Sequence, residues 1–318
     1  MLSLSDVVRL PYTPDLTLAG IADTCRKRAR AAYPSQPVIL ENLHASVAST
    51  ASELAFRRYL DQQHVAYQLR KSPTPNNPDQ RVLELAGNRC EWICPLISNH
   101  SDIQQLREDA NRLLALTVRL PRYTFIPSLA GDEDRMIFSF VIGLVTRTSR
   151  ELEKTRTGQQ PEYLIHFFPK PTFGGQYWTP LGQIELQANC RQPVGLECAG
   201  LNGERIFQSE EIVLEPGQTS CLQKDYYSLV YVHLKEAFDV RVEINNQILS
   251  RPYSIEPAEW QNIWVYGTNI YVAGYLPRRE LRYLQRRRAN SNRNEIESLT
   301  GKYFPTVADL HPITNLFH

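Results

Sequence analysis

Long apolar runs are missing from this sequence of 318 residues. The longest is MIFSFVIGLV at Met136–Val145, which is far shorter than the roughly 20 residues that a helix needs to cross a bilayer. The N-terminal stretch MLSLSDVVRLPYTPDL has Asp6 and Pro11 where a secretory signal needs an unbroken apolar core. We therefore expect no membrane partner, and we expect the protein to be cytoplasmic.

Cysteine is also sparse. The six cysteines are too few to hold a chain of this length together, and a reducing compartment keeps them as thiols. A zinc site built on Cys90 and Cys94 needs two further ligands at similarly tight spacing, whereas Cys190 and Cys198 stand eight residues apart without a nearby histidine. Buried free thiols are therefore the better interpretation.

Several common catalytic motifs are absent as well. The sequence contains no G-x-S-x-G nucleophile motif, no G-x-G-x-x-G motif and no P-loop. It thus gives no support for Ser-His-Asp hydrolysis or for nucleotide hydrolysis of the common kinds. His166 and His233 lie inside apolar strands, where hydrogen-bonded core histidines are more common than catalytic bases or metal ligands.

The remaining composition is that of a globular chain with both helices and strands. Hydrophobic residues make up 42% of the chain and aromatic residues 10%, and sixteen tyrosines accompany only two methionines. In the N-terminal half, periodicity predicts helices at 15–32, 49–64 and 100–120, a strand at 65–71, a hairpin with its turn near Gly87, and a fully buried strand at 134–149.

The C-terminal half is richer in strands. Seven short apolar segments follow one another from Glu162 onwards, separated by Gly, Pro and Asn turns, which is typical of a sandwich or a strongly curved sheet. The polar stretch 147–161 is the most plausible boundary. We therefore predict an α+β fold with a mixed α/β region containing a strand meander at 1–150, and a β-rich region closed by a basic helix at 151–318.

Three acidic residues of the first region follow an order typical of metal-dependent nucleases. Glu53 lies on the second predicted helix, Asp79 follows Pro78 in a loop, and Glu91 lies on the second strand of the hairpin. Oxygen ligands from consecutive strands suit Mg²⁺, which can bridge a phosphate and a water molecule. The alternative is that the three side chains are ordinary solvated or hydrogen-bonded carboxylates.

This region resembles the PD-(D/E)XK nuclease superfamily over about 49–97, through the segments SELAFRRYL, NPDQRVLELAG and RCEWIC. The resemblance implies that Asp79 and Glu91 hold Mg²⁺ and that Glu53 supports them as a third catalytic acid. The lysine of the third motif falls at position 93, which is Ile93. The pairs Glu185 with Gln187 and Glu243 with Asn245 are weaker alternatives.

A second group of charges lies near the C-terminus. GYLPRRELRYLQRRR at 274–288 carries six arginines in a chain whose net charge is only +1. We expect a helix beginning near Pro277 whose arginines bind the phosphates of a nucleic acid, with DNA favoured over RNA. These arginines are Arg278, Arg279, Arg282, Arg286, Arg287 and Arg288. The competing interpretations are internal ion pairs with Glu295, Glu297 and the Glu-rich strands, a contact with a protein partner or a homo-oligomer, and a solvated face.

Aromatic residues precede this basic segment. Trp260, Trp264 and Tyr266 could stack on nucleobases, although aromatics in an apolar strand pair are usually core residues. Taken together, the sequence predicts a nucleic-acid-binding protein of a defence or genome-maintenance system, with a degenerate or metal-dependent nuclease-like core. A non-catalytic protein-interaction or assembly subunit is the alternative, and whether the chain is an enzyme stays open.

Overall fold

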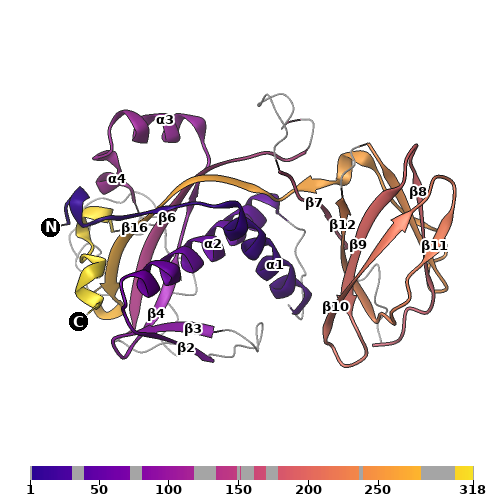
Figure 1. The fold of residues 1–318 in the computed structure, drawn as a ribbon, viewed down its shortest axis with the longest axis horizontal. Helices are drawn as coiled ribbons and strands as arrows, with labels where there is room; N and C mark the ends of the chain where they lie inside the picture. The colour runs from indigo at the N-terminus through magenta and orange to yellow at the C-terminus, as the bar shows by residue number, and fades with distance from the viewer. Residues whose placement is uncertain are drawn as a thin grey trace, which may run out of the picture. The chain divides into compact units, whose positions relative to one another are not determined.

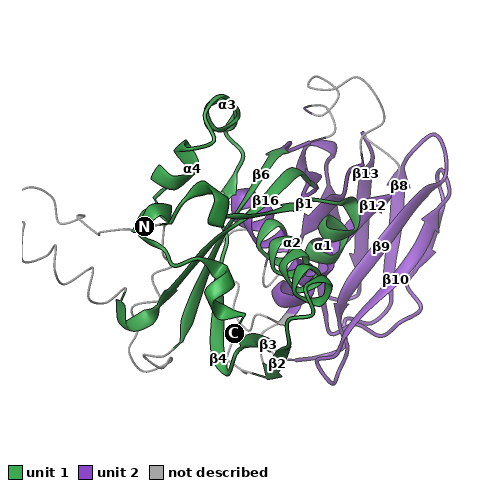
Figure 2. Ribbon diagram, turned by 60° about the vertical axis from the view of Figure 1, so that its left-hand side comes forward, with its two compact units in different colours: residues 1–20, 48–144, 265–318 green, residues 21–47, 145–264 purple. Residues whose placement is uncertain are grey.

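The structure is a computed structural model of the chain. It describes residues 2–30, 39–71, 81–117, 134–148, 151, 161–169, 178–235, 239–280 and 305–317. The fold is α+β, as predicted, with helices and both mixed and antiparallel sheets (Figure 1). The chain forms two compact units, coloured separately in Figure 2.

The division into units differs from the predicted boundary at residue 150. Unit 1 comprises Met1–Gly20, Ala48–Leu144 and Val265–His318, and unit 2 comprises Ile21–Val47 and Val145–Trp264. The passage into unit 2 at Val145 lies close to the predicted boundary. However, the C-terminal segment from Val265 returns to unit 1, because its strand pairs with strands from the N-terminal half.

Unit 1 is built on a seven-stranded mixed sheet. The strands follow the order β1-β16-β6-β4-β3-β2, with β5 paired to β6. Their bounds are β1 Val8–Pro11, β2 Tyr67–Lys71, β3 Arg81–Leu85, β4 Asn88–Ile93, β5 Leu96–Ile97, β6 Arg135–Val145 and β16 Val265–Pro277. Strands β2, β3 and β4 form an antiparallel meander, and β4 runs parallel to β6.

The turn between β3 and β4 follows the sequence prediction. Ala86 and Gly87 have φ values of 48° and 74°, and Leu85 pairs with Asn88 across the turn. Positive φ at both central residues is the geometry of the two-residue turn that matches the twist of a hairpin. The predicted buried strand is also confirmed, because Met136–Ile142 of β6 are buried without interruption.

The helices are α1 Pro14–Arg30, α2 Leu40–Gln62, α3 His100–Glu108 and α4 Arg112–Ala115. Helix α2 begins at Leu40 and not at the predicted Ser49, because its buried stripe already includes Leu43 and Val47. The single helix predicted at 100–120 is two helices in the described residues up to 117. The break occurs at Asp109, which is extended and whose carboxylate accepts the N–H of Asn111 at 3.0 Å.

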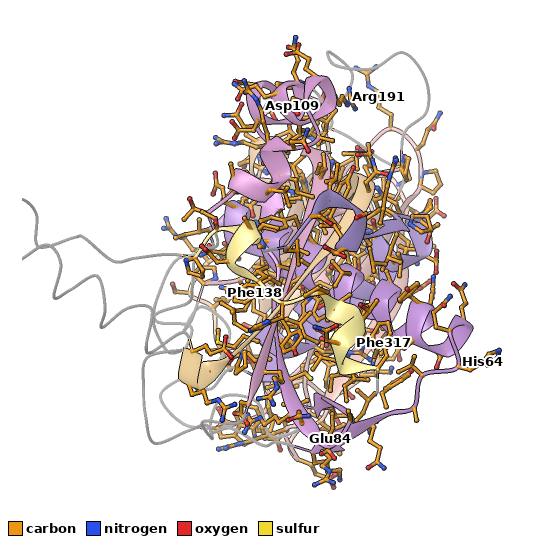
Figure 3. All side chains as sticks on the ribbon, turned by 90° about the vertical axis from the view of Figure 1, so that its left-hand side faces the viewer. His64, Glu84, Asp109, Phe138, Arg191 and Phe317 are labelled. Atoms are coloured by element: carbon orange, nitrogen blue, oxygen red, sulfur yellow. The ribbon has the colours of Figure 1, made fainter. Side chains whose placement is uncertain are left out.

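The two faces of the unit 1 sheet have different coverings. On one face, Trp92 of β4 contacts Phe56 of α2 with ring centroids 5.2 Å apart. On the other face, Ile93 joins an apolar cluster that includes Phe138, which is labelled in Figure 3 and is fully buried. Helix α4 and the C-terminal residues 305–317 contribute Leu113 and other members of this cluster. Alternate residues of β4 therefore face α2 and this cluster.

Unit 2 contains two antiparallel sheets with a common core, as the strand-rich sequence predicted. One sheet has the order β10-β9-β12-β7-β15 and the other β11-β8-β13-β14. Their bounds are β7 Leu164–Phe167, β8 Ile184–Asn189, β9 Val194–Leu201, β10 Phe207–Leu214, β11 Thr219–Cys221, β12 Ser228–Lys235, β13 Arg241–Asn246, β14 Tyr253–Ile255 and β15 Gln261–Asn262. Leu196 of β9 and Leu186 of β8 belong to one buried cluster, so the core lies between the two sheets.

Candidate nucleic-acid interface

Arg278 occupies an internal ion pair. Its Nη2 donates to Oε2 of Glu91 at 2.8 Å, and its side chain is only 4% exposed. The preceding residues Gly274–Pro277 continue strand β16 and do not begin a helix, although residues 278–280 are helical. A guanidinium buried in this way cannot reach an external phosphate, so the prediction that Arg278 contacts nucleic acid is wrong.

Glu53 and Glu91 emerge on different sides of the unit 1 sheet. Glu91 shares its face of β4 with Ile93, which is 5% exposed within the apolar cluster. Glu53 belongs to α2, which packs on the opposite face through Phe56 and Trp92. The adjacent Ser52 donates to Ser139 of β6 at 3.0 Å on that same side. The predicted convergence of Glu53 and Glu91 is therefore not formed.

The described part of the chain does not contain a formed site for the predicted metal ion. Asp79 lies outside the described residues, and the Glu91 carboxylate is already bound by the Arg278 guanidinium. Within the described ranges, no group of three or more His, Cys, Asp or Glu side chains is arranged to hold a metal ion. Glu53 and Glu91 thus do not share a Mg²⁺, and a site formed by Asp79 with Glu91 stays a prediction.

The other predicted arginines divide into one that is described and four that are not. Arg279 follows Arg278 directly and is exposed. Arg282, Arg286, Arg287 and Arg288 lie outside the described residues. Their contact with nucleic acid stays a prediction.

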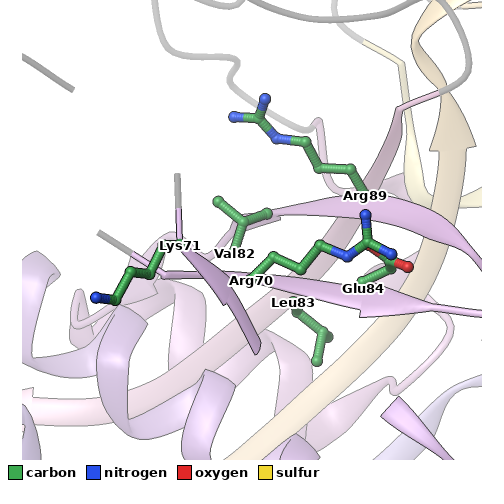
Figure 4. Close-up of a pocket in the computed structure, with 6 residues that line it drawn as sticks. All are labelled: Arg70, Lys71, Val82, Leu83, Glu84 and Arg89. Carbon is green, nitrogen blue, oxygen red and sulfur yellow. The ribbon is translucent and has the colours of Figure 1, made fainter. Parts of the chain in front are cut away.

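A cationic pocket that the sequence did not predict lies on the meander of unit 1. Six residues line a pocket of about 200 Å³, shown in Figure 4: Arg70, Lys71, Val82, Leu83, Glu84 and Arg89. The cationic pocket, as we use the term, comprises Arg70, Lys71 and Arg89. Its members come from β2 and β4, with β3 between them. The cross-strand pairs Arg70 with Val82 and Glu84 with Arg89 place Arg70 and Arg89 on one face of the meander, and Lys71, which pairs with Arg81, lines the pocket from the end of β2.

The three cations of the pocket differ in their partners. Arg70 lies along the strands and its Nε reaches Oε2 of Glu84 at 2.5 Å (Figure 4). Lys71 and Arg89 are exposed, and no acidic side chain among the described residues pairs with either of them. Because the single lining carboxylate is bound by Arg70, the pocket keeps a positive charge that can attract an external anion.

The aromatic residues predicted as possible stacking partners are core residues. Trp260 is 2% exposed, and its Nε1 donates to the carbonyl oxygen of Val240 at 2.8 Å. Trp264 and Tyr266 are each 6% exposed. Bases therefore cannot stack on these rings, and the core interpretation of the segment is confirmed.

The two strand histidines are both partnered within unit 2. His166 Nε2 lies 3.0 Å from the Tyr253 hydroxyl, and burial lowers the pKa of this imidazole. His233 Nδ1 lies 3.4 Å from Oε2 of Glu197, and the interaction with His233 is the main cause that lowers the pKa of Glu197. Both histidines are therefore core side chains with polar partners, as the sequence analysis expected.

Glu197 has further partners in the same cluster. The hydroxyls of Tyr163 and Tyr231 each donate to its carboxylate at 3.4 Å. Burial raises the pKa of both tyrosine hydroxyls, which keeps them protonated as donors. The Tyr163 ring stacks on His233 with centroids 3.5 Å apart. The cluster is closely packed, and its carboxylate is held by three neighbouring side chains.

Comparison of the chain with protein-family models, with curated proteins and with solved structures gave no match. Among the described residues, no helix has the length and apolar content that crossing a membrane requires.

Proposed function

We propose that the chain binds nucleic acid through the cationic pocket of unit 1. The observation that carries this proposal is the pair of exposed cations, Lys71 and Arg89, beside a third cation whose carboxylate partner lies within the same pocket. Cationic side chains bind phosphate oxygens with charge-assisted hydrogen bonds, and each neutralised phosphate releases counterions. DNA is the favoured partner, as in the sequence analysis.

The topology of unit 1 supports this proposal. A helix, α2, leads into the antiparallel meander β2-β3-β4, and α3 and α4 then lead to β6, which is parallel to β4. This order agrees with the helix and strand meander on which the resemblance to the PD-(D/E)XK superfamily was based. The cationic pocket lies on this same meander, so the proposal and the resemblance involve the same part of unit 1.

We further propose that this core binds without cleaving. Position 93 is a buried isoleucine where the resemblance requires a lysine, and Glu91 is bound by Arg278. A metal ion at Glu91 would have to displace a buried guanidinium and would leave that charge without its carboxylate, which is costly. We expect no DNA cleavage in Mg²⁺, and cleavage that disappears in Asp79→Ala and Glu91→Ala would contradict this part of the proposal.

The binding proposal is tested by a salt titration. Fluorescence anisotropy with labelled single-stranded and duplex DNA gives Kd at several salt concentrations, for the wild type and for Lys71→Gln/Arg89→Gln. Log K falls as log salt rises, and each phosphate contact that is lost makes this slope less steep by about 1. The double variant should therefore bind more weakly and show a slope that is smaller by about 2.

A matched control removes the same charge from the other unit. Arg191 and Arg251 are both exposed in unit 2, and Arg191 lies at the surface in Figure 3. Arg191→Gln/Arg251→Gln should keep the wild-type slope. Equal slopes for the wild type and for Lys71→Gln/Arg89→Gln would refute the pocket, and equal losses in both double variants would indicate only a general effect of net charge.

The C-terminal arginines need a separate variant. Arg286→Gln/Arg287→Gln/Arg288→Gln tests the original prediction for the basic segment, and it leaves the pocket intact. A smaller salt slope in this variant would add the basic segment to the interface. An unchanged slope would assign the phosphate contacts to the pocket alone.

A protein-interaction role is the second candidate. Strand β10 is an edge strand of its sheet as described, and Val213 on it is 58% exposed. Exposed strand edges with apolar side chains can pair with another chain. A chain that binds no nucleic acid at moderate salt, and that forms a dimer disrupted by Val213→Lys, would favour this candidate.

A further inference from the structure

An exposed tryptophan in unit 2 is held in a fixed orientation. Trp178 is 39% exposed, and its Nε1 donates to the carbonyl oxygen of Gly203 at 2.9 Å. The Tyr227 ring lies beside it, with centroids 5.6 Å apart and an interplanar angle of 31°. The hydrogen bond and the neighbouring ring restrict the indole, so its exposed surface is presented without a large loss of side-chain entropy on binding.

The turn beside this ring is also ordered by its own hydrogen bonds. Asn202 Oδ1 accepts the backbone N–H groups of Glu204 at 3.0 Å and Ile206 at 2.9 Å. Arg205 has a φ of 60°, and its N–H donates to the Asn202 carbonyl oxygen at 3.0 Å. The turn therefore holds Arg205 in a defined position between β9 and β10.

Arg205 places a flat cation on the tryptophan. The carbon at the centre of its guanidinium lies 5.3 Å from the Trp178 ring centroid. Arg205 is itself exposed, so it can move without breaking a buried contact. The guanidinium thus occupies the space over the indole ring, which shows that this space accepts a planar group.

We infer that Trp178 and Arg205 form a stacking site for an unpaired base of single-stranded nucleic acid. This inference rests on the proposed function, because it supplies a second contact for the same ligand. The base stacks on the indole, and the Arg205 guanidinium either stacks on the base or binds the adjacent phosphate. The site selects unpaired bases because the faces of paired bases are covered within a duplex.

A nucleobase fits this site better than a protein partner does. The site offers one aromatic ring and one guanidinium, with Ile206 adjacent at 55% exposed. A stable protein interface buries more than about 1,000 Å² and usually centres on several buried anchors. A base needs only one ring of matching size and a cation for its phosphate, and both are present.

The site is tested with oligo(dT) and a duplex of the same length. Stacking on one aromatic side chain contributes about 1–3 kcal/mol per base when measured by alanine substitution, so Trp178→Ala should weaken oligo(dT) binding by about 5- to 150-fold. Duplex affinity should not change. The salt slope should also not change, because the lost contact is uncharged.

Trp178→Phe is the matched control, since phenylalanine retains a ring and loses the hydrogen bond to Gly203. It should retain most of the oligo(dT) affinity, and the quenching of tryptophan fluorescence that oligo(dT) causes in the wild type should disappear. Thermal unfolding of both variants checks that unit 2 is intact.

The outcomes separate the two proposals. If the wild type binds DNA through the cationic pocket but Trp178→Ala keeps full oligo(dT) affinity, the stacking site is refuted and the proposed function stands. An equal loss of oligo(dT) and duplex affinity also refutes it. If the wild type binds neither oligo(dT) nor the duplex at moderate salt, both proposals fail together.

Discussion

Replacing Arg278 by methionine should destabilise unit 1, although the residue lies in an arginine-rich segment that would ordinarily be considered a surface feature. Its side chain is 4% exposed and its partner Glu91 is 23% exposed. Removing one member of a buried ion pair typically costs 3–5 kcal/mol, because the remaining charge is left buried without a partner. Glu91 keeps some contact with solvent, so we expect the low end, about 3 kcal/mol.

The neighbouring arginine provides the control for this prediction. Arg279 is exposed, and Arg279→Met should change the free energy of unfolding by less than about 0.5 kcal/mol. The double variant Arg278→Met/Glu91→Leu should recover most of the lost stability, because replacing both members of a buried pair by apolar side chains is often neutral. The pair thus forms a double-mutant cycle whose coupling energy should be large.

Differential scanning calorimetry and urea denaturation measure these effects, and hydrogen exchange of the β4 and β6 amides assigns them to unit 1. A loss of about 3 kcal/mol corresponds to a decrease in Tm of roughly 6–12 °C for a unit of this size. The ion-pair interpretation is refuted if Arg278→Met and Arg279→Met have equal stability. A specific loss of DNA affinity in Arg278→Met, without loss of stability, would instead restore Arg278 to the interface.

Three further predictions follow from buried side chains. Ile93→Lys should destabilise unit 1 and should not create Mg²⁺-dependent cleavage, because position 93 is 5% exposed in an apolar cluster where a lysine has no partner; gained cleavage with retained stability would contradict this. Glu197→Gln should lower the stability of unit 2 at pH 7 by about 1–2 kcal/mol and should make it less sensitive to acid. The pKa of Glu197 is lowered in the folded state mainly by His233, so its contribution is present above the unfolded pKa and is lost as the pH falls through the folded value; identical pH profiles would rule this out. In the native protein, a thiol reagent should modify Cys221 before Cys198, since Cys221 is half-buried and burial raises the pKa of the Cys198 thiol; the reverse order would show that unit 2 opens readily.

Local patterns predicted much of the fold. The hairpin turn at Gly87 has a chemical cause, because a residue without a side chain tolerates positive φ, and the apolar run of β6 indicates burial on both faces. The strand-rich half likewise follows from alternation and turn residues. By contrast, the return of β16 to unit 1 depends on pairing between strands far apart in the sequence, for which a local window carries no signal.

The residues of the candidate site also depend on contacts between distant segments, which a local sequence window cannot predict. Arg278 and Arg279 are adjacent and chemically identical, yet one is buried in an ion pair and the other is exposed. Only the end of β16 and its approach to Glu91 distinguish them. Similarly, Lys71 and Arg89 are isolated cations in the sequence, and the fold of the meander brings both to the lining of one pocket. The spacing of β4 alone, in contrast, could have shown that Glu91 and Ile93 share one face.

The most direct test of the cationic pocket is lysine footprinting with an amine-reactive acetylating reagent, followed by mass spectrometry, in the presence and absence of saturating DNA. Lys71 should react several-fold more slowly when DNA is bound, whereas Lys27, which pairs with Asp23 in unit 2, should keep its rate. A Lys71 that reacts equally fast with and without bound DNA would contradict binding at the pocket.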